Sequence, residues 1–151
     1  MKRPDASIVV VHHRGPEHLF EALAALDEAC RGRLAAEVIV VDNASGLPVD
    51  ELLRRHPATR RVVAGANVGF AAGCRLGAEA ARAPALLFVN DDAVVLPEAP
   101  LLLAEALSRA EPDVVAVAGR LTDLAGERND FSDGFLTFDG HAFQKEVGRP
   151  V

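Results

Sequence analysis

The sequence predicts an α/β domain with an open, largely parallel sheet and flanking helices. Two observations lead to this fold class. Short apolar runs alternate along the chain with longer stretches in which leucines recur at helical spacing. The apolar runs also lack the alternation of a sheet with one solvated face, as expected of parallel strands that helices cover on both sides.

Strands and helices are expected in strict alternation. The expected strands are 6–11, 36–42, 59–65, 85–90 and 113–121, and the expected helices are 16–30, 49–56, 69–82 and 97–110. Pro16 stands near the start of the first helix, where proline is favoured, and Pro57 halts the second. After Leu121 the periodicity ends, so we expect residues 122–151 to form irregular loops with one hairpin.

Composition excludes several classes of protein. A chain of 151 residues that is 50% hydrophobic is long enough for one domain with a real core. A net charge of −6 argues against a general nucleic-acid binder, which needs a basic surface. The start "MKRPDAS" leads directly into a strand without a signal-type apolar region, so a cytoplasmic protein is expected. Cys30 and Cys74 lack metal-type spacing and are expected to be buried free thiols.

The candidate site follows from the fold class, because open α/β sheets bind ligands outside the carboxyl ends of their strands. Polar residues follow four of the expected strands: His12, His13 and Arg14; Asp42, Asn43 and Ser45; Asn67; and Asn90, Asp91 and Asp92. All these residues should therefore line one edge of the sheet.

In "ALLFVNDDAVVLP", two adjacent carboxylates end an apolar strand with no basic residue beside them. Asp91 and Asp92 suit a hard cation such as Mg²⁺ or Mn²⁺, which takes a few carboxylate oxygens and completes its shell with water and phosphate. The alternative is that both acids only form the turn that ends the strand.

The other strand ends have a functional and a structural interpretation as well. Asp42 either accepts hydrogen bonds from a ribose or a base, or forms an Asx turn with Ser45. His12 and His13 either contact a base or phosphate, or belong to a solvated loop. No G-x-G-x-x-G follows the first strand, where the chain reads "HHRGPEH", so a dinucleotide site is not expected.

The stretch "NVGFAAGCRLG" places small residues around the start of the third helix. Small residues at a helix N-terminus let a phosphate approach closely. Close packing of the helix on the sheet explains Gly73 and Gly77 equally well. Arg75 either meets a phosphate or pairs with Glu79.

Four motifs, "SIVVVHHR", "VIVVDNASG", "ANVGFAAGCRLGAEAA" and "LLFVNDDAVVLP", stand in this order from about Ser7 to Leu121. Together they resemble the family 2 inverting glycosyltransferases of GT-A fold (nucleotide-diphospho-sugar transferase type), in particular the rhamnosyltransferase-like and galactofuranosyltransferase-like branch. The nucleotide-binding residues that the resemblance implies are His12, His13, Asp42, Asn67, Gly69 with the following Phe70, Asn90 and Asp91. It also implies that Asp92, together with Asp91, binds the Mg²⁺ or Mn²⁺ ion that bridges the diphosphate.

The resemblance further implies a metal-assisted transfer, with inversion, from a UDP- or dTDP-sugar to a hydroxyl of a saccharide or glycolipid. Such an acceptor implies peripheral contact with the inner face of the membrane. The family's catalytic base lies in a later E-D-type motif, which has no match before Val151, so no catalytic residue is assigned. We therefore expect a chain truncated before that segment, with a nucleotide-sugar-binding domain at 1–121 and the irregular start of the acceptor side at 122–151.

Two other functions stay open. A sugar nucleotidyltransferase shares the sheet and the metal chemistry, but it should carry a basic, glycine-rich loop after the first strand, which "HHRGP" matches poorly. A non-catalytic nucleotide-binding or protein-interaction module would need no catalytic base. A phosphoacceptor receiver domain is excluded, because the acids follow the second and fourth strands.

Overall fold

The computed structural model describes residues 3–46, 54–56, 59–136 and 142–151. The chain divides into two units, Met1–Ser108 and Arg109–Val151. The first unit contains the parallel sheet, and the second contains short antiparallel strand pairs.

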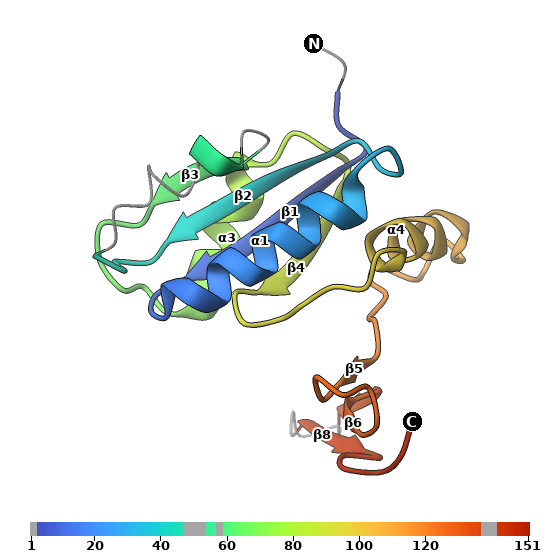
Figure 1. Ribbon diagram of the computed structural model, residues 1–151. Helices are drawn as coiled ribbons and strands as arrows, with labels where there is room; N and C mark the ends of the chain where they lie inside the picture. Colours follow the sequence, from blue (N-terminus) through green and yellow to red (C-terminus); the bar gives the residue numbers. More distant parts are fainter. Residues whose placement is uncertain (1–2, 47–53, 57–58, 137–141) are drawn as a thin grey trace. The chain divides into compact units, whose positions relative to one another are not determined.

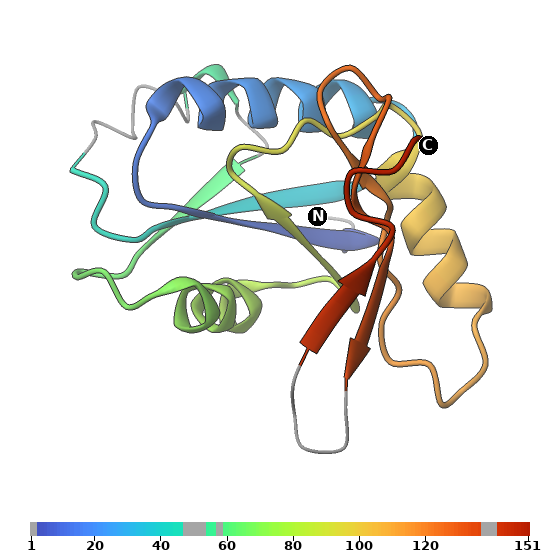
Figure 2. The same ribbon diagram turned by 90° about the horizontal axis from the view of Figure 1, so that it is seen from below.

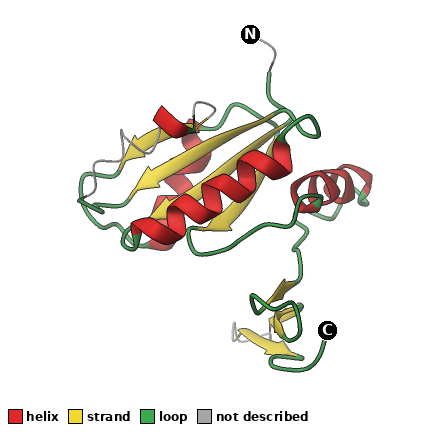
Figure 3. Ribbon diagram, viewed as in Figure 1, coloured by secondary structure: helices red, strands yellow, loops and turns green. Residues whose placement is uncertain are grey.

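The sheet of the first unit consists of strands that all run parallel (Figure 1). In the order β3-β2-β1-β4 they are β1 (Ala6–His12), β2 (Ala36–Asp42), β3 (Thr59–Val63) and β4 (Ala85–Asn90). The first four predicted strands are thus confirmed, and the third ends slightly earlier than expected. Along this part of the chain, a helix stands between β1 and β2 and another between β3 and β4 (Figure 3).

Helices α1 (Pro16–Cys30) and α3 (Phe70–Ala80) cover opposite faces of the sheet (Figure 2). The leucines of α1, Leu19, Leu23 and Leu26, form one core cluster with Ile8, Val10, Val38, Val40 and Val89. Residues of α3 pack on the other face, against Val9, Val11, Ile39 and Val41. Successive residues of β1 therefore enter different cores, which explains why its sequence is apolar without alternation.

Helix α3 lies unusually close to the sheet at two glycines. A Cβ atom added to Gly73 would lie 2.7 Å from Cγ1 of Val11, and one added to Gly77 would lie 2.3 Å from Cγ1 of Val9. Neither distance is compatible with an unshifted side chain. The packing interpretation of both glycines is therefore confirmed, and Arg75 forms an ion pair with Glu79 as the structural alternative predicted.

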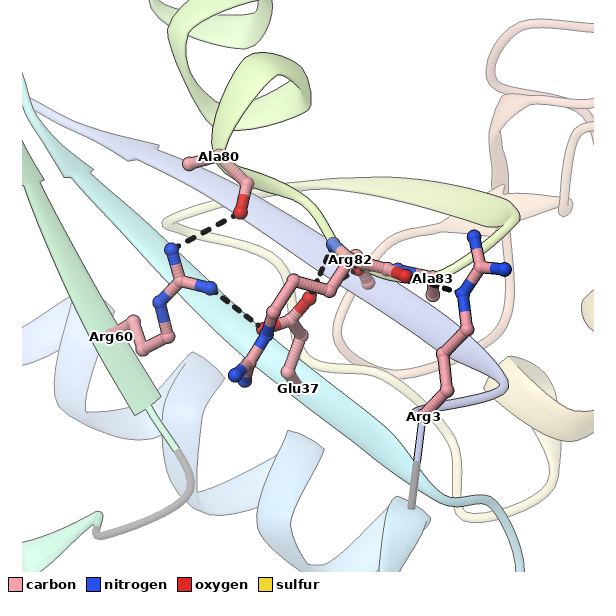
Figure 4. A network of polar contacts seen from close by, with 7 residues as sticks. Arg3, Glu37, Arg60, Ala80, Arg82 and Ala83 are labelled. Atoms are coloured by element: carbon pink, nitrogen blue, oxygen red, sulfur yellow. Dashed lines mark hydrogen bonds and ion pairs between the residues drawn. The ribbon is translucent and has the colours of Figure 1, made fainter. Parts of the chain in front are cut away.

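A polar network joins the strand starts at the edge opposite to the candidate site (Figure 4). The buried carboxylate of Glu37 accepts hydrogen bonds from Ser7 Oγ at 2.7 Å and from the Arg82 backbone N–H at 2.7 Å. It also accepts from Arg82 Nε at 2.8 Å and Arg60 Nη1 at 3.1 Å, while Arg60 Nη2 donates to the Ala80 carbonyl at 3.1 Å. One carboxylate thus ties β1, β2 and β3 to the end of α3.

Burial alone would raise the pKa of Glu37, but the hydrogen bonds from Arg82 and Ser7 and the charge of Arg82 outweigh it. They lower the pKa of Glu37 from 4.5 to about 2. The native state therefore keeps this carboxylate ionised under conditions in which the unfolded chain protonates it.

The predicted fifth strand, over 113–121, is wrong. Residues 114–120 have no strand conformation, and Val115 is 91% exposed. Only Leu121 and Thr122 form strand pairs, and they do so antiparallel to residues 129–131. A strand needs a neighbour that supplies hydrogen bonds, and the apolar character of a run carries no information about that neighbour.

The remaining elements are α4 and the short strands of the second unit. They are α4 (Ala99–Arg109), β5 (Leu121–Thr122), β6 (Asn129–Phe131), β7 (Asp133–Leu136) and β8 (Ala142–Lys145). Strands β5 and β6 form one antiparallel pair, and β7 and β8 another, where the sequence predicts one hairpin. The domain boundary after residue 121 stays a prediction.

Two smaller points concern helices. Of the short helix predicted over 49–56, Arg54 and Arg55 are helical, and residues 49–53 lie outside the described residues. Among the helices of the described ranges, none combines the length and the apolar character that crossing a membrane requires.

The Glu37 network predicts an acid-dependent loss of stability. Because the folded pKa is depressed, the stabilisation is complete above the unfolded pKa, near 4.5, and disappears as the pH falls towards 2. We expect Glu37→Gln to lower the free energy of unfolding by about 2–3 kcal/mol at neutral pH, with a difference from wild type that shrinks below pH 4.5. Urea unfolding at a series of pH values measures this difference. Glu79→Gln, in an exposed pair, is the control and should cost less than about 1 kcal/mol; an equal, pH-independent effect of both variants would contradict the prediction.

The close approach of α3 predicts that Gly77→Ala destabilises the protein although alanine is the better helix former. The added methyl group meets Val9, whose branched side chain cannot turn away, so overpacking of about 1–3 kcal/mol should exceed the helix-propensity gain of about 1 kcal/mol. Urea unfolding of Gly77→Ala, Val9→Ala and the double variant tests this. The alanine penalty should shrink in the Val9→Ala background, and a more stable single variant would show that α3 has room at this position.

Candidate functional site

The strand order places a topological switch point between β1 and β4. The chain passes from β1 to β2 and β3 on one side and returns to β4 on the other side of β1. The register pairs His12 with Asp42 and Val11 with Asn90, so the strands end at one edge. Ligands of open α/β sheets bind in the crevice at such a point.

His12, the last residue of β1, is completely buried. Its Nδ1 lies 2.6 Å from Oδ2 of Asp91, which follows β4 and is about a quarter exposed. Its Nε2 is also buried and has no hydrogen-bond partner among the described residues. His12 therefore contacts the candidate site through Asp91 and is not itself exposed there.

His13 and two asparagines form a second polar cluster at the same edge. The Asn67 side-chain oxygen accepts from the Gly69 backbone N–H at 3.0 Å and from Asn43 Nδ2 at 3.0 Å. Asn67 Nδ2 consequently faces Nε2 of His13, 3.1 Å away, and donates to it. His13 Nδ1 must then carry the proton, which it donates to the Asn43 carbonyl at 2.8 Å. The cluster thus fixes the orientation of the His13 ring.

Asn43 is a residue of this cluster that the sequence places at a strand end without assigning it a role. It is buried, and its side-chain oxygen accepts from the Val68 N–H at 2.9 Å. Its own backbone N–H donates to the His12 carbonyl at 2.7 Å. Its position directly after Asp42, at a strand end, is the signal in the sequence that points to it.

Asp42 forms the Asx turn that the structural interpretation predicted. Its Oδ1 accepts from the backbone N–H of Ser45 at 2.9 Å and from the Ser45 hydroxyl at 2.7 Å. Its Oδ2 accepts from Arg61 Nη2 at 2.6 Å. Burial alone would raise the pKa of Asp42, but the bonds from Ser45 and Arg61 lower it below its usual 3.8. Both carboxylate oxygens of Asp42 thus already have protein partners. Its role in nucleotide binding stays a prediction.

An open depression of about 390 Å³ lies at the switch point. Its lining residues are Val11, His13, Arg14, Asn43, Asn67, Gly69, Phe70 and Asp91. Of the predicted nucleotide-binding residues, the depression brings together His13, Asn67, Gly69, Phe70 and Asp91. The others, His12, Asp42 and Asn90, and the predicted metal ligand Asp92 lie outside its lining.

Arg14 and Phe70 add a charge and an aromatic surface to the depression. Arg14 is exposed and has no ion pair with any described residue. Phe70 is 56% exposed although it belongs to an apolar helix face, because it lies at the N-terminal end of α3. The depression therefore offers a cation, an aromatic ring, amide groups and a carboxylate to a ligand.

The acids of the site fit a cation that is shared with a ligand. Asp92 is exposed and receives no hydrogen bond from the described residues, and one oxygen of Asp91 is not used by His12. Within the described part of the chain, no group of three or more His, Cys, Asp or Glu side chains could hold a metal ion. Two adjacent carboxylates suit Mg²⁺ or Mn²⁺ when phosphate and water supply the other ligands.

Comparison with known proteins agrees with this architecture. The model of glycosyl transferase family 2 matches residues 7–146. The mannosyltransferase PcManGT from Pyrobaculum calidifontis, solved in complex with GDP-Man and Mn²⁺, is 26% identical, with a TM-score of 0.60 over 76% of this chain and 34% of its own. TarS 1-349 from S. aureus is 16% identical, with a TM-score of 0.61 over 76% of this chain and 38% of its own. No curated protein matches the chain significantly.

The chain spans about a third of the length of these two solved structures. The likeness to TarS shows the fold alone, and the family model covers nearly the entire chain. The predicted GT-A fold, with its mostly parallel sheet and flanking helices, is confirmed. On these grounds, the chain belongs to glycosyl transferase family 2.

Proposed function

We propose that this chain is the nucleotide-sugar-binding portion of a glycosyltransferase. The observation that carries the proposal is the depression at the ends of β1 and β4, where His13, Asn67, Gly69 and Asp91 meet. Its volume, about 390 Å³, lies within the range of small-molecule sites. Membership of family 2 favours glycosyl transfer over the nucleotidyl transfer that the sheet alone also allows.

The chemistry of the lining suits a nucleoside diphosphate. The exposed guanidinium of Arg14 provides a positive charge for phosphate oxygens. Helix α3 begins at the depression without a side-chain cap at Gly69, so its first N–H groups favour an anion there. The ring of Phe70 offers a face on which a base can stack.

Asp91 and Asp92 would hold a Mg²⁺ or Mn²⁺ ion together with the diphosphate. When bound, such an ion neutralises phosphate charge and stabilises the departing nucleoside diphosphate. The chain's own residues then bind and orient the donor: the His13 cluster fixes the wall of the pocket, and Arg14 faces the phosphates. The complete enzyme would transfer the sugar with inversion, by a single displacement, to a saccharide or glycolipid hydroxyl, which would bring it to the membrane surface in polysaccharide biosynthesis.

The base of the nucleotide is open to test. The motifs of the rhamnosyltransferase-like and galactofuranosyltransferase-like branch favour UDP or dTDP. PcManGT, which is 26% identical, binds GDP-Man, and this supports GDP as a third candidate. A non-catalytic nucleotide-binding module would use the same depression and would differ only in lacking transfer.

The proposal predicts metal-dependent binding of a nucleoside diphosphate. We expect calorimetric titration with UDP, dTDP or GDP to show binding that strengthens with Mn²⁺ and that Asp92→Asn weakens at least about tenfold, which is about 1.4 kcal/mol. Asp5→Asn removes an exposed carboxylate next to the start of β1, at the opposite edge, and should bind as wild type does. If a folded chain binds none of the three nucleotides with Mn²⁺, the donor-site proposal fails, and an interaction module becomes the better interpretation.

A further inference from the structure

We infer that His12 is a positioning residue that fixes the Asp91 carboxylate for the metal-bound diphosphate, an inference that rests on the proposed function. His12 lines no surface, so it cannot touch a ligand in the depression. Within the described residues, its one side-chain hydrogen bond is the 2.6 Å bond to Asp91, which does line the depression.

Folding stability does not explain a histidine at this place. The ring is completely buried, yet its Nε2 has no partner within the described ranges. A buried nitrogen without a hydrogen bond is destabilising compared with an apolar side chain of similar size. Such unsatisfied groups require another explanation, and a functional site is where proteins tolerate them.

The bond to Asp91 restricts a carboxylate that the backbone alone leaves free. Asp91 lies in the turn after β4, where Ala93 N–H donates to the Asn90 carbonyl at 3.2 Å. His12 belongs to the central strand, which β2 and β4 flank, and its position is fixed by that pairing. His12 donates its Nδ1–H to Oδ2 of Asp91 from this rigid strand. The bond selects one rotamer of Asp91 and leaves Oδ1 for a cation or ligand.

The backbone of His12 links the same strand end to the other polar cluster. Its carbonyl accepts the Asn43 N–H at 2.7 Å, and Asn43 in turn holds His13 and Asn67. A substitution that keeps this backbone bond but removes the imidazole N–H therefore changes Asp91 selectively. The geometry of the His13 cluster should be preserved in such variants.

Three substitutions separate positioning from packing. His12→Leu keeps the bulk and removes the donor, so we expect equal or higher stability to urea but about 10–100-fold weaker binding of Mn²⁺ with nucleoside diphosphate. His12→Asn places an amide N–H near the position of Nδ1 and should keep affinity within a few fold of wild type despite the smaller side chain. His12→Gln places its amide near Nε2 and should bind as weakly as the leucine variant.

The experiment combines calorimetric titration of Mn²⁺ with UDP, dTDP and GDP, Mn²⁺ electron paramagnetic resonance and urea unfolding on the 151-residue chain. Asp91→Asn supplies a double-mutant cycle: in that background, His12→Leu should have no further effect on affinity, because its partner's charge is already gone. Should the leucine variant not fold, the asparagine and glutamine variants decide the question.

The outcomes distinguish the two proposals. The positioning role of His12 is supported if nucleotide affinity is high in His12→Asn and low in His12→Leu and His12→Gln, while the stabilities of the three variants follow a different order. If the wild-type chain binds and His12→Leu binds with the same affinity, the role of His12 is overturned and the proposed function stands. Affinities that follow the stabilities of the variants have the same consequence. Absence of binding by the folded wild-type chain overturns both.

Discussion

The parallel pairing of β1 with both of its neighbours is the constraint on which the rest of the structure depends. All seven residues of β1 are buried, and each is in register with β2, while all but the last are also in register with β4. A shift of this strand would carry apolar side chains out of both cores and break two ladders of hydrogen bonds. The ends of the three strands are therefore fixed relative to one another by the sheet itself. The loops shape the depression in detail, but the strand order determines where the depression lies.

The acids at the ends of the strands fall into two groups, those whose oxygens protein groups occupy and those that leave oxygens available to a ligand. At the strand starts, Glu37 is fully engaged by Ser7, Arg60 and Arg82. At the strand ends, Asp42 is engaged in the same way, by Ser45 and Arg61. Asp91 and Asp92 are not: the first has one oxygen held by a buried histidine, and the second is exposed. Charge that the protein leaves uncompensated is charge that a ligand or ion can use.

The sequence was sufficient for β1 and β2, because burial of both faces gives a strand a continuous apolar run. It failed at residues 114–117, where an equally apolar run pairs with no strand among the described residues. At the site, the strand-end rule brought His13, Asn67 and Asp91 together, as the depression shows. It could not tell that His12 points inward while its neighbour His13 lines the surface, since two adjacent histidines are equivalent in the sequence. Nor could it choose between a ligand and the Asx turn for Asp42, because both use the same carboxylate oxygens.

The consecutive arginines of β3 also determine how that edge strand is aligned. Adjacent side chains of a strand point to opposite faces, so Arg60 reaches Glu37 on the face that α3 covers and Arg61 reaches Asp42 on the other. A slip of β3 by one residue would exchange the two faces and deprive both acids of β2 of their arginine partners on β3. Strand β3 has few buried side chains of its own, and apolar burial alone would align it weakly. The arginine pair thus favours a single register, because each arginine finds its acid only when β3 is aligned as observed.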